Sequence, residues 1–221
     1  MKKTFVVIVI VILVMLFFWF FARKSAAPEP PKTDKSTNPS LSVSAVTNSN
    51  KTTWAAPISN ARERIIKKPF GIYVSPGHSP VSPEKFTGYH TGVDFETLPD
   101  EQNVDVPVFA VCDGKLIYKN WLSGYGGVAV QSCTLNNQSV TVLYGHLDVS
   151  SIAPAINSRL AAGQKIGVLG RGYSTETDGE RKHLHLAVHK GAAVNLRGYV
   201  QNENELNSWI DFATLDASKL I

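Results

Sequence analysis

The sequence lacks the short motifs that identify several common classes of hydrolase. It has no H-E-x-x-H segment, which excludes a helix carrying two zinc-binding histidines and a glutamate base. It also has no G-x-S-x-G segment, and neither of its two cysteines, Cys112 and Cys133, stands in a recognisable nucleophile motif. Nucleophilic attack by a protein side chain is therefore not expected.

Clustered positive charge is also missing. The net charge of +4 comes from basic residues that are scattered along the chain without interleaved aromatic residues. Because a nucleic-acid partner requires a basic patch or stripe, nucleic acid is excluded as a partner. The basic residues are interpreted as solvated surface.

One segment has no polar or charged residue at all. Residues 5–22, FVVIVIVILVMLFFWFFA, would span about 27 Å as a helix, close to the thickness of a bilayer. We interpret residues 1–24 as a membrane anchor with a signal-anchor helix over 5–22. A cleaved signal peptide is the alternative, but its apolar region is shorter, and this run leads into Arg23 and Lys24. Basic residues flank both ends of the run, so the positive-inside rule does not decide the orientation. We choose the orientation that places the bulk of the chain outside the cytoplasm.

The next segment lacks apolar periodicity. Residues 25–57 are dominated by Ser, Thr, Asn, Pro, Ala and Lys, a composition typical of a disordered linker. A flexible chain of about 35 residues has an end-to-end distance of about 30 to 35 Å. Such a linker would let a folded domain search the space beside a membrane.

From about Pro69 onward, short apolar or alternating runs follow one another, separated by Gly, Pro, Asn and Asp. These runs predict a mostly β fold with an antiparallel sheet or sandwich. The clearest runs are residues 108–111, 115–118, 127–131, 139–143, 165–169 and 183–188. Helical periodicity is weak until residues 204–212, where one short C-terminal helix is expected.

The two cysteines flank a predicted β-hairpin whose tip lies near residues 122–125. If the pairing register centres on that tip, Cys112 faces Cys133. Two cysteines fit either free thiols or one disulfide. An extracytoplasmic location favours oxidation, so we predict the disulfide.

Three of the six histidines lie within KHLHLAVH, residues 182–189. If this stretch is a strand, His183 and His185 share one face, while Leu184 and Leu186 point to the other and enter the core. Two imidazoles would then lie side by side on one surface of the sheet. An isolated H-x-H is more often simply polar surface, so the interpretation depends on further residues.

Two other segments supply further candidate residues. His90 and Asp94 stand in GYHTGVDFE, and His146 follows an apolar run in LYGHL. A catalytic zinc ion takes three N or O ligands from the protein and leaves one position for water. His90, Asp94 and one histidine of the H-x-H pair would supply that set. The remaining two histidines would be free for proton transfer or for stabilising charge on oxygen.

Together these segments resemble the lysostaphin-type, LytM-like zinc peptidases, which are peptidoglycan endopeptidases. The resemblance runs from about Pro69 to Asn195 and depends on the order and spacing of several motifs. These are HTGVD (90–94), PVFAVCDGKLIY (107–118), GYGG (124–127), LYGHL (143–147), LAAGQKIGVLG (160–170) and HLHLAV (183–188).

The resemblance implies a role for each candidate residue. His90, Asp94 and His185 are implied to bind Zn²⁺, and His146 and His183 are implied to be the catalytic histidines. The implied fold is an antiparallel β-sheet core with a groove lined by loops. The implied activity is that of a zinc metalloendopeptidase, in which zinc-activated water hydrolyses peptide bonds of bacterial cell-wall peptidoglycan.

The resemblance also implies a location. We expect a single-pass protein of the bacterial cytoplasmic membrane whose zinc peptidase domain, residues 58–221 with a core over 69–195, faces the periplasm or cell wall. The expected partners are peptidoglycan peptides and, through the N-terminal helix, the membrane, and the protein is expected to be a monomer. The alternative is a catalytically inactive adaptor of the same fold that binds peptidoglycan or activates a separate wall hydrolase. Such adaptors tend to lose ligands, whereas this chain keeps all five positions.

One segment departs from the family pattern. The family usually has Gly-Pro or a similar short turn before H-x-H, whereas this chain has Arg181 and Lys182 after a longer polar loop, residues 172–180. This loop and residues 97–105 are expected to shape the wall of the groove.

Overall fold

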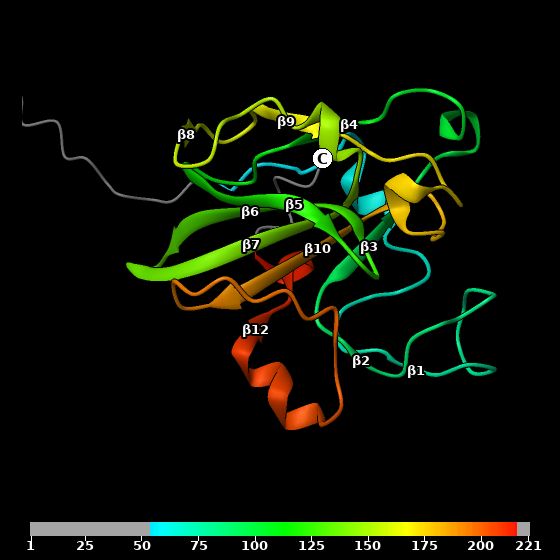
Figure 1. The fold of residues 1–221 in the computed structure, drawn as a ribbon. Coiled ribbons are helices and arrows are strands. Elements are labelled where there is room, and N and C mark those ends of the chain that lie inside the picture. Colours follow the sequence, from blue (N-terminus) through cyan, green and yellow to red (C-terminus); the bar gives the residue numbers. More distant parts are fainter. Residues whose placement is uncertain (1–53, 216–221) are drawn as a thin grey trace, which may run out of the picture. The chain divides into compact units, whose positions relative to one another are not determined.

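The computed structural model describes residues 54–215. The predicted membrane helix over residues 5–22 and most of the predicted linker lie outside the described residues. Within residues 54–215, none of the helices is both long enough and apolar enough to cross a bilayer. The described part of the chain consists of β-strands, short 3-10 helices and loops (Figure 1).

A seven-stranded antiparallel sheet carries most of the core, so the prediction of a mostly β fold is confirmed. Six strands follow the order β12-β10-β7-β6-β5-β8, and β3 pairs with the first half of β10 (Figure 1). The strands of this sheet are β3 (Val93–Glu96), β5 (Gly114–Leu122), β6 (Gly126–Leu135), β7 (Gln138–Leu147), β8 (Arg159–Leu160), β10 (His183–Lys190) and β12 (Trp209–Ile210).

Smaller elements surround this sheet. A three-stranded sheet has the order β1-β2-β11 and a two-stranded sheet pairs β4 with β9. Their strands are β1 (Tyr73–Val74), β2 (Gly88–His90), β11 (Tyr199–Val200), β4 (Pro107–Phe109) and β9 (Lys165–Val168). The 3-10 helices are η1 (Ala61–Arg64), η2 (Pro99–Glu101), η3 (Val149–Ser151), η4 (Thr175–Thr177), η5 (Glu203–Ser208) and η6 (Phe212–Thr214).

The alternation predicted for the H-x-H strand is present in β10. Leu184 and Leu186 are fully buried in the main hydrophobic core. Because side chains alternate along a strand, His183 and His185 lie on the opposite face, and both line one cavity. The apolar face of β10 therefore anchors the strand, and its other face is available for polar chemistry.

The predicted β-hairpin and disulfide are both present. β5 and β6 pair up to Leu122 and Gly126, and a disulfide joins Cys112 to Cys133, whose Cα atoms are 6.1 Å apart. The run from Val106 into this hairpin is not one continuous strand, however. It divides at Ala110, whose backbone bonds instead to residues 163–164: Ala110 N donates to Gln164 O and its carbonyl accepts from Gly163 N.

The C-terminal helix expected over residues 204–212 is wrong in type and extent. The structure has the 3-10 helix η5, which ends at Ser208 because the next residues join the sheet. Trp209 pairs with His189 of β10, and its side chain is buried. Sheet pairing and burial of an indole therefore outweigh a weak helical pattern.

Residues before the first strand also pack against the body of the domain. Trp54, Ile58 and Ala61 are buried in the main core, and the Trp54 ring lies 6.1 Å from that of Phe212.

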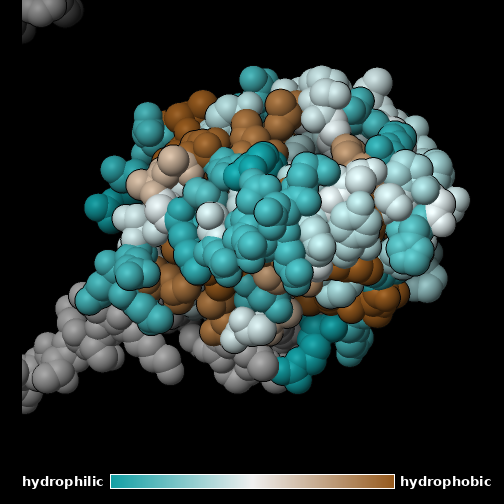
Figure 2. Space-filling model, turned by 90° about the horizontal axis from the view of Figure 1, so that it is seen from below, coloured by the Kyte–Doolittle hydropathy of each residue, from teal (hydrophilic) through white to brown (hydrophobic). Residues whose placement is uncertain are grey.

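The face shown in Figure 2 is mostly hydrophilic, with hydrophobic residues in smaller separate groups. This face is therefore largely solvated surface.

Candidate functional site

Strand register brings the first two candidate residues together. In the antiparallel pair β3–β10, Asp94 lies directly opposite His185. On the other side of β10, His185 pairs with Gly145, the residue before His146. Asp94, His146 and His185 are all buried. The short strand β3 therefore places a carboxylate beside the imidazole of the H-x-H strand.

His90 reaches the same point from the end of β2. Its ring lies against that of His185, with centroids 4.8 Å apart. The turn between β2 and β3 passes close to β10 at Gly92. A Cβ there would meet the backbone oxygen of Leu186 and lie 2.9 Å from His185 Cε1. Glycine at this position therefore allows the H-T-G-V-D segment to approach the H-x-H strand.

The three predicted ligands converge in a small triangle. His90 Nε2 lies 2.9 Å from His185 Nδ1, and Asp94 Oδ1 lies 3.2 Å from each of these nitrogens. These three residues form the group that could hold a metal ion among the described residues. The structure therefore brings together the set His90, Asp94 and His185.

The positions of the ring protons around this triangle fit a cation at its centre. His90 Nδ1 lies 3.2 Å from the carbonyl oxygen of Pro69, which only accepts, so Nδ1 carries the proton and Nε2 presents a lone pair. An ionised Asp94 also only accepts. A proton on His185 Nδ1 would leave the lone pairs of His90 and Asp94 facing each other at 3.2 Å. A cation satisfies all three atoms, and two imidazoles with one carboxylate form a donor set that suits zinc.

The ionisation states of His185 and Asp94 agree with these proton positions. Burial, the largest cause, lowers the pKa of His185 to about 4, although Asp94 acts in the opposite direction, so the imidazole is neutral at pH 7. Burial alone would raise the pKa of Asp94, but the imidazoles of His183 and His90 hold it well below its ordinary value. His185 Nε2 is buried and has no hydrogen-bond partner among residues 54–215. Metal binding through Nδ1 would place the ring proton on Nε2.

His146 and His183 form a second pair beside the triangle. Their ring centroids are 4.2 Å apart, and both rings line a cavity of about 290 Å³ together with Asp94 and His185. His146 has φ 62°, a left-handed conformation that is costly for a residue with a Cβ. Such strain occurs preferentially at functional sites.

The two histidines of this pair differ in their surroundings. His183 Nδ1 lies 2.9 Å from the carbonyl oxygen of Arg181, so Nδ1 carries a proton, and Nε2 faces Asp94 Oδ2 at 3.3 Å. His146 Nδ1 is buried and has no partner in the described part of the chain. Burial and, to a smaller extent, His183 lower the pKa of His146 well below its ordinary value. His146 is therefore a neutral imidazole, whereas His183 holds a proton on Nδ1 beside Arg181 and directs Nε2 toward the Asp94 carboxylate.

Several residues around the cavity were not identified as site residues from the sequence. The Lys68 ammonium lies 2.6 Å from Glu84 Oε2 and donates to the Tyr199 hydroxyl at 3.0 Å. Arg181 bonds to the carboxylate of Asp94, and Tyr125 places its ring 5.5 Å from that of His146. Only GYGG around Tyr125 and the unusual residue pair at 181–182 carried any sequence signal. The others come from segments without a motif.

The loops flanking the cavity follow the sequence expectation in part. From residues 172–180, Glu180 lines the cavity and pairs with Lys85 at 3.2 Å. Residues 102–105 instead line a separate cavity of about 560 Å³. Residues 97–105 are not among those that line the histidine cavity, and their expected role in the wall of the groove stays a prediction.

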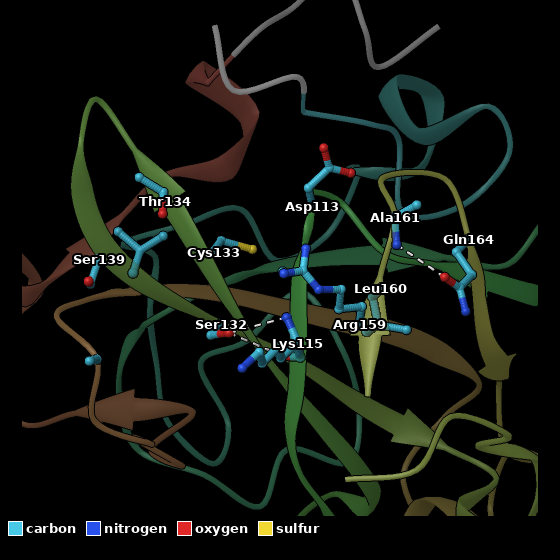
Figure 3. A pocket seen from close by; sticks show the side chains of 13 residues that line it. Asp113, Lys115, Ser132, Cys133, Thr134, Ser139, Arg159, Leu160, Ala161 and Gln164 are labelled. Atoms are coloured by element: carbon cyan, nitrogen blue, oxygen red, sulfur yellow. Dashed lines mark hydrogen bonds between the residues drawn. The ribbon is translucent and has the colours of Figure 1, made fainter. Parts of the chain in front are cut away.

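A larger cavity lies away from these residues. It has a volume of about 750 Å³ and is lined by polar and basic side chains such as Arg159 and Lys115 (Figure 3). None of the six histidines lines it. His78 is exposed, and His189 packs against Trp209 at 5.0 Å. The candidate site is therefore the smaller cavity, which holds the histidine pair and borders the triangle.

Comparisons with known proteins agree with this location. Residues 88–196, which include all five predicted site residues, match the family model described as Peptidase family M23. The catalytic domain of the antimicrobial peptidase lysostaphin from Staphylococcus simulans is 22% identical, with a TM-score of 0.43, over 65% of this chain and 84% of that chain. LytU is 24% identical, with a TM-score of 0.45, over 67% and 81%. The cbpa protein from L. salivarius REN is 18% identical, with a TM-score of 0.49, over 76% and 97%. No curated protein matches the chain.

Proposed function

Because residues 88–196 form a domain of peptidase family M23, we propose that this chain is a zinc metalloendopeptidase that hydrolyses peptide bonds of bacterial cell-wall peptidoglycan. The observation that carries the proposal is the convergence of three lone-pair donors, His90, Asp94 and His185, beside a pair of histidines in one cavity. An adaptor that only binds wall material would need neither group.

Each ligand atom is held by its own element. His90 Nε2 faces the centre because Pro69 accepts from Nδ1, and His185 Nδ1 faces it from β10. Asp94 Oδ1 completes the set from β3. A zinc ion held by these residues would supply Lewis acidity for acidifying water and polarising a substrate carbonyl.

His183 and His146 perform the proton chemistry in this proposal. His183 accepts a proton from the attacking water at Nε2, because Nδ1 is bonded to the Arg181 carbonyl and the Asp94 carboxylate 3.3 Å from Nε2 stabilises the imidazolium that forms. His146 is neutral and donates a hydrogen bond to the oxygen on which negative charge develops. His183 can then return its proton to the leaving amine. This division of roles follows from the surroundings of the two rings.

The location outside the cytoplasm and the anchoring by residues 1–24 remain part of the proposal. The Cys112–Cys133 disulfide supports an oxidising compartment. The substrate class comes from the family and from the resemblance of the motifs, and it requires a direct assay.

The test uses the purified full chain and purified sacculi. We expect release of amino groups that depends on zinc and that falls about 100-fold or more in His146→Ala. His78→Ala, which changes an exposed histidine between β1 and β2, serves as the matched control and should keep wild-type activity. Equal release of amino groups by the wild type and His146→Ala would contradict the proposed peptidase activity and favour the adaptor. Less than about 0.2 zinc per chain after mild purification would contradict the metal site itself.

A further inference from the structure

Arg181 lies next to the metal-ligand triangle, in the segment that departs from the family pattern. Its side chain is only 11% exposed. A guanidinium is always charged in proteins, and a buried charge is strongly destabilising unless it is paired. The position of Arg181 therefore depends on specific acidic partners.

Those partners are two carboxylates on one face of β3. Val93 and Phe95 point into the core, so Asp94 and Glu96 project together from the opposite face. Arg181 donates to Glu96 through Nε at 3.0 Å and through Nη2 at 2.6 Å. The same Nη2 donates to Asp94 Oδ2 at 2.7 Å. One guanidinium therefore spans both carboxylates.

This contact divides the two oxygens of Asp94. Oδ2 accepts from Arg181 at 2.7 Å and also lies 3.3 Å from His183 Nε2, whereas Oδ1 lies 3.2 Å from both His90 Nε2 and His185 Nδ1. Without Arg181 the carboxylate could rotate and present either oxygen, or both, to the triangle. Glu96 in turn fixes the guanidinium plane through its bidentate contact, a geometry that arginine makes and lysine does not.

We propose that Arg181 is a positioning residue that holds Asp94 with a single oxygen directed at the zinc ion, with Glu96 as its anchor. This inference rests on the proposed function, because it assigns a role toward the same metal. Removal of a positioning residue changes zinc affinity in the opposite direction to removal of a charge. A positive charge next to a metal ligand repels the metal, so removal of a charge that did nothing else would strengthen zinc binding.

The experiment measures the zinc affinity of the full chain by competition with a chelating indicator. Arg181→Lys keeps the positive charge but loses the bidentate contact of the guanidinium, and Arg181→Gln loses both. We expect both variants to bind zinc about 10- to 100-fold more weakly, the range typical of residues that orient metal ligands. Glu96→Gln, which keeps Arg181 and removes its anchor, should also weaken binding. The visible spectrum of bound Co²⁺ should change in these variants, because the coordination of Asp94 changes.

The matched control is Arg171→Lys. Arg171 lies in the same loop and bonds to Glu176 at 2.9 Å, but it is exposed and contacts no ligand. This variant should keep wild-type zinc affinity and the wild-type Co²⁺ spectrum. If Arg181→Gln does not fold by circular dichroism, Arg181→Lys and Glu96→Gln decide the question.

Two results would overturn the inference. One is wild-type affinity, within about twofold, in Arg181→Lys and Glu96→Gln. The other is tighter binding by Arg181→Gln with unchanged binding by Arg181→Lys, which would show a charge effect alone. Either result would leave the proposed function intact, provided that the wild type binds zinc. Failure of the wild type to bind zinc would instead overturn the proposed function.

Discussion

Asp94 and His185 lie directly opposite each other in the pair β3–β10, and Asp94 Oδ1 is 3.2 Å from His185 Nδ1. Cross-strand neighbours in a sheet are held at a fixed separation by backbone hydrogen bonds. The distance between this carboxylate and this imidazole is therefore a property of the sheet rather than of a flexible loop. The register of β3 on β10 therefore places these two residues side by side, and the following results are expected.

Asp94→Asn should reduce zinc affinity by more than the 10- to 100-fold typical of a residue that only orients a ligand. The substitution keeps the shape of the side chain but removes the negative charge that balances the metal. Zinc content and affinity measure the effect. Asp113→Asn, which changes an exposed carboxylate at the larger cavity, is the control. Wild-type affinity in Asp94→Asn would argue against this carboxylate as a ligand.

His183→Gln should lower kcat by about 10²- to 10⁴-fold, the range for loss of a general base, and leave zinc content unchanged. The residue contacts Asp94 Oδ2 at 3.3 Å but lies outside the triangle of ligand atoms. The measurement is amino-group release from sacculi alongside metal analysis. Loss of zinc together with activity would reassign His183 as a ligand.

The metal-free protein should lose stability between pH 6.5 and pH 4. Burial lowers the pKa of His185 to about 4 in the folded state, whereas the unfolded chain takes up a proton near pH 6.5. The unfolded state therefore binds more protons in this window, and the free energy of unfolding decreases as pH falls. The contribution of His185 is about 3 kcal/mol. Urea unfolding with a chelator at several pH values measures it. His185→Gln should flatten the dependence, and His78→Ala should not.

Peptidase activity should fall as pH drops below about 6. Protons compete with the metal for histidine ligands, because a protonated imidazole cannot bind a metal. Amino-group release from sacculi across pH 4.5 to 8, with zinc in excess, gives the profile. Undiminished activity at pH 4.5 would be incompatible with histidine ligands and a histidine base.

Replacement of both cysteines by serine should lower the free energy of unfolding by about 2 to 4 kcal/mol, because the disulfide closes a loop with a sequence separation of 21 residues. Zinc affinity should not change, since Cys133 lines the larger cavity rather than the histidine site (Figure 3). Denaturant unfolding and a zinc titration check the two statements. A parallel loss of affinity would show that the hairpin transmits strain to the site.

The local sequence pattern was sufficient to predict those strands and turns that depend on neighbouring residues alone. The alternation in residues 183–188 predicts which side chains of β10 enter the core, because a strand has a period of two. The hairpin at residues 122–126 follows from the same period, whereas Cys112 lies before β5 and reaches Cys133 from outside the paired register. The weak helical pattern of residues 204–212 failed, because pairing of Trp209 with β10 is a tertiary effect.

For the site, residue types and motif spacing by themselves determined the candidate set, and the family resemblance divided it into ligands and catalytic histidines. Only the tertiary structure decided how those atoms face one another: the register of Asp94 on His185, the oxygen that Asp94 presents, the ring nitrogens that carry protons, and the guanidinium of Arg181. The physical reason is distance along the chain. Asp94 is separated from His185 by 91 residues and from Arg181 by 87, and side-chain periodicity carries no information about contacts over such separations.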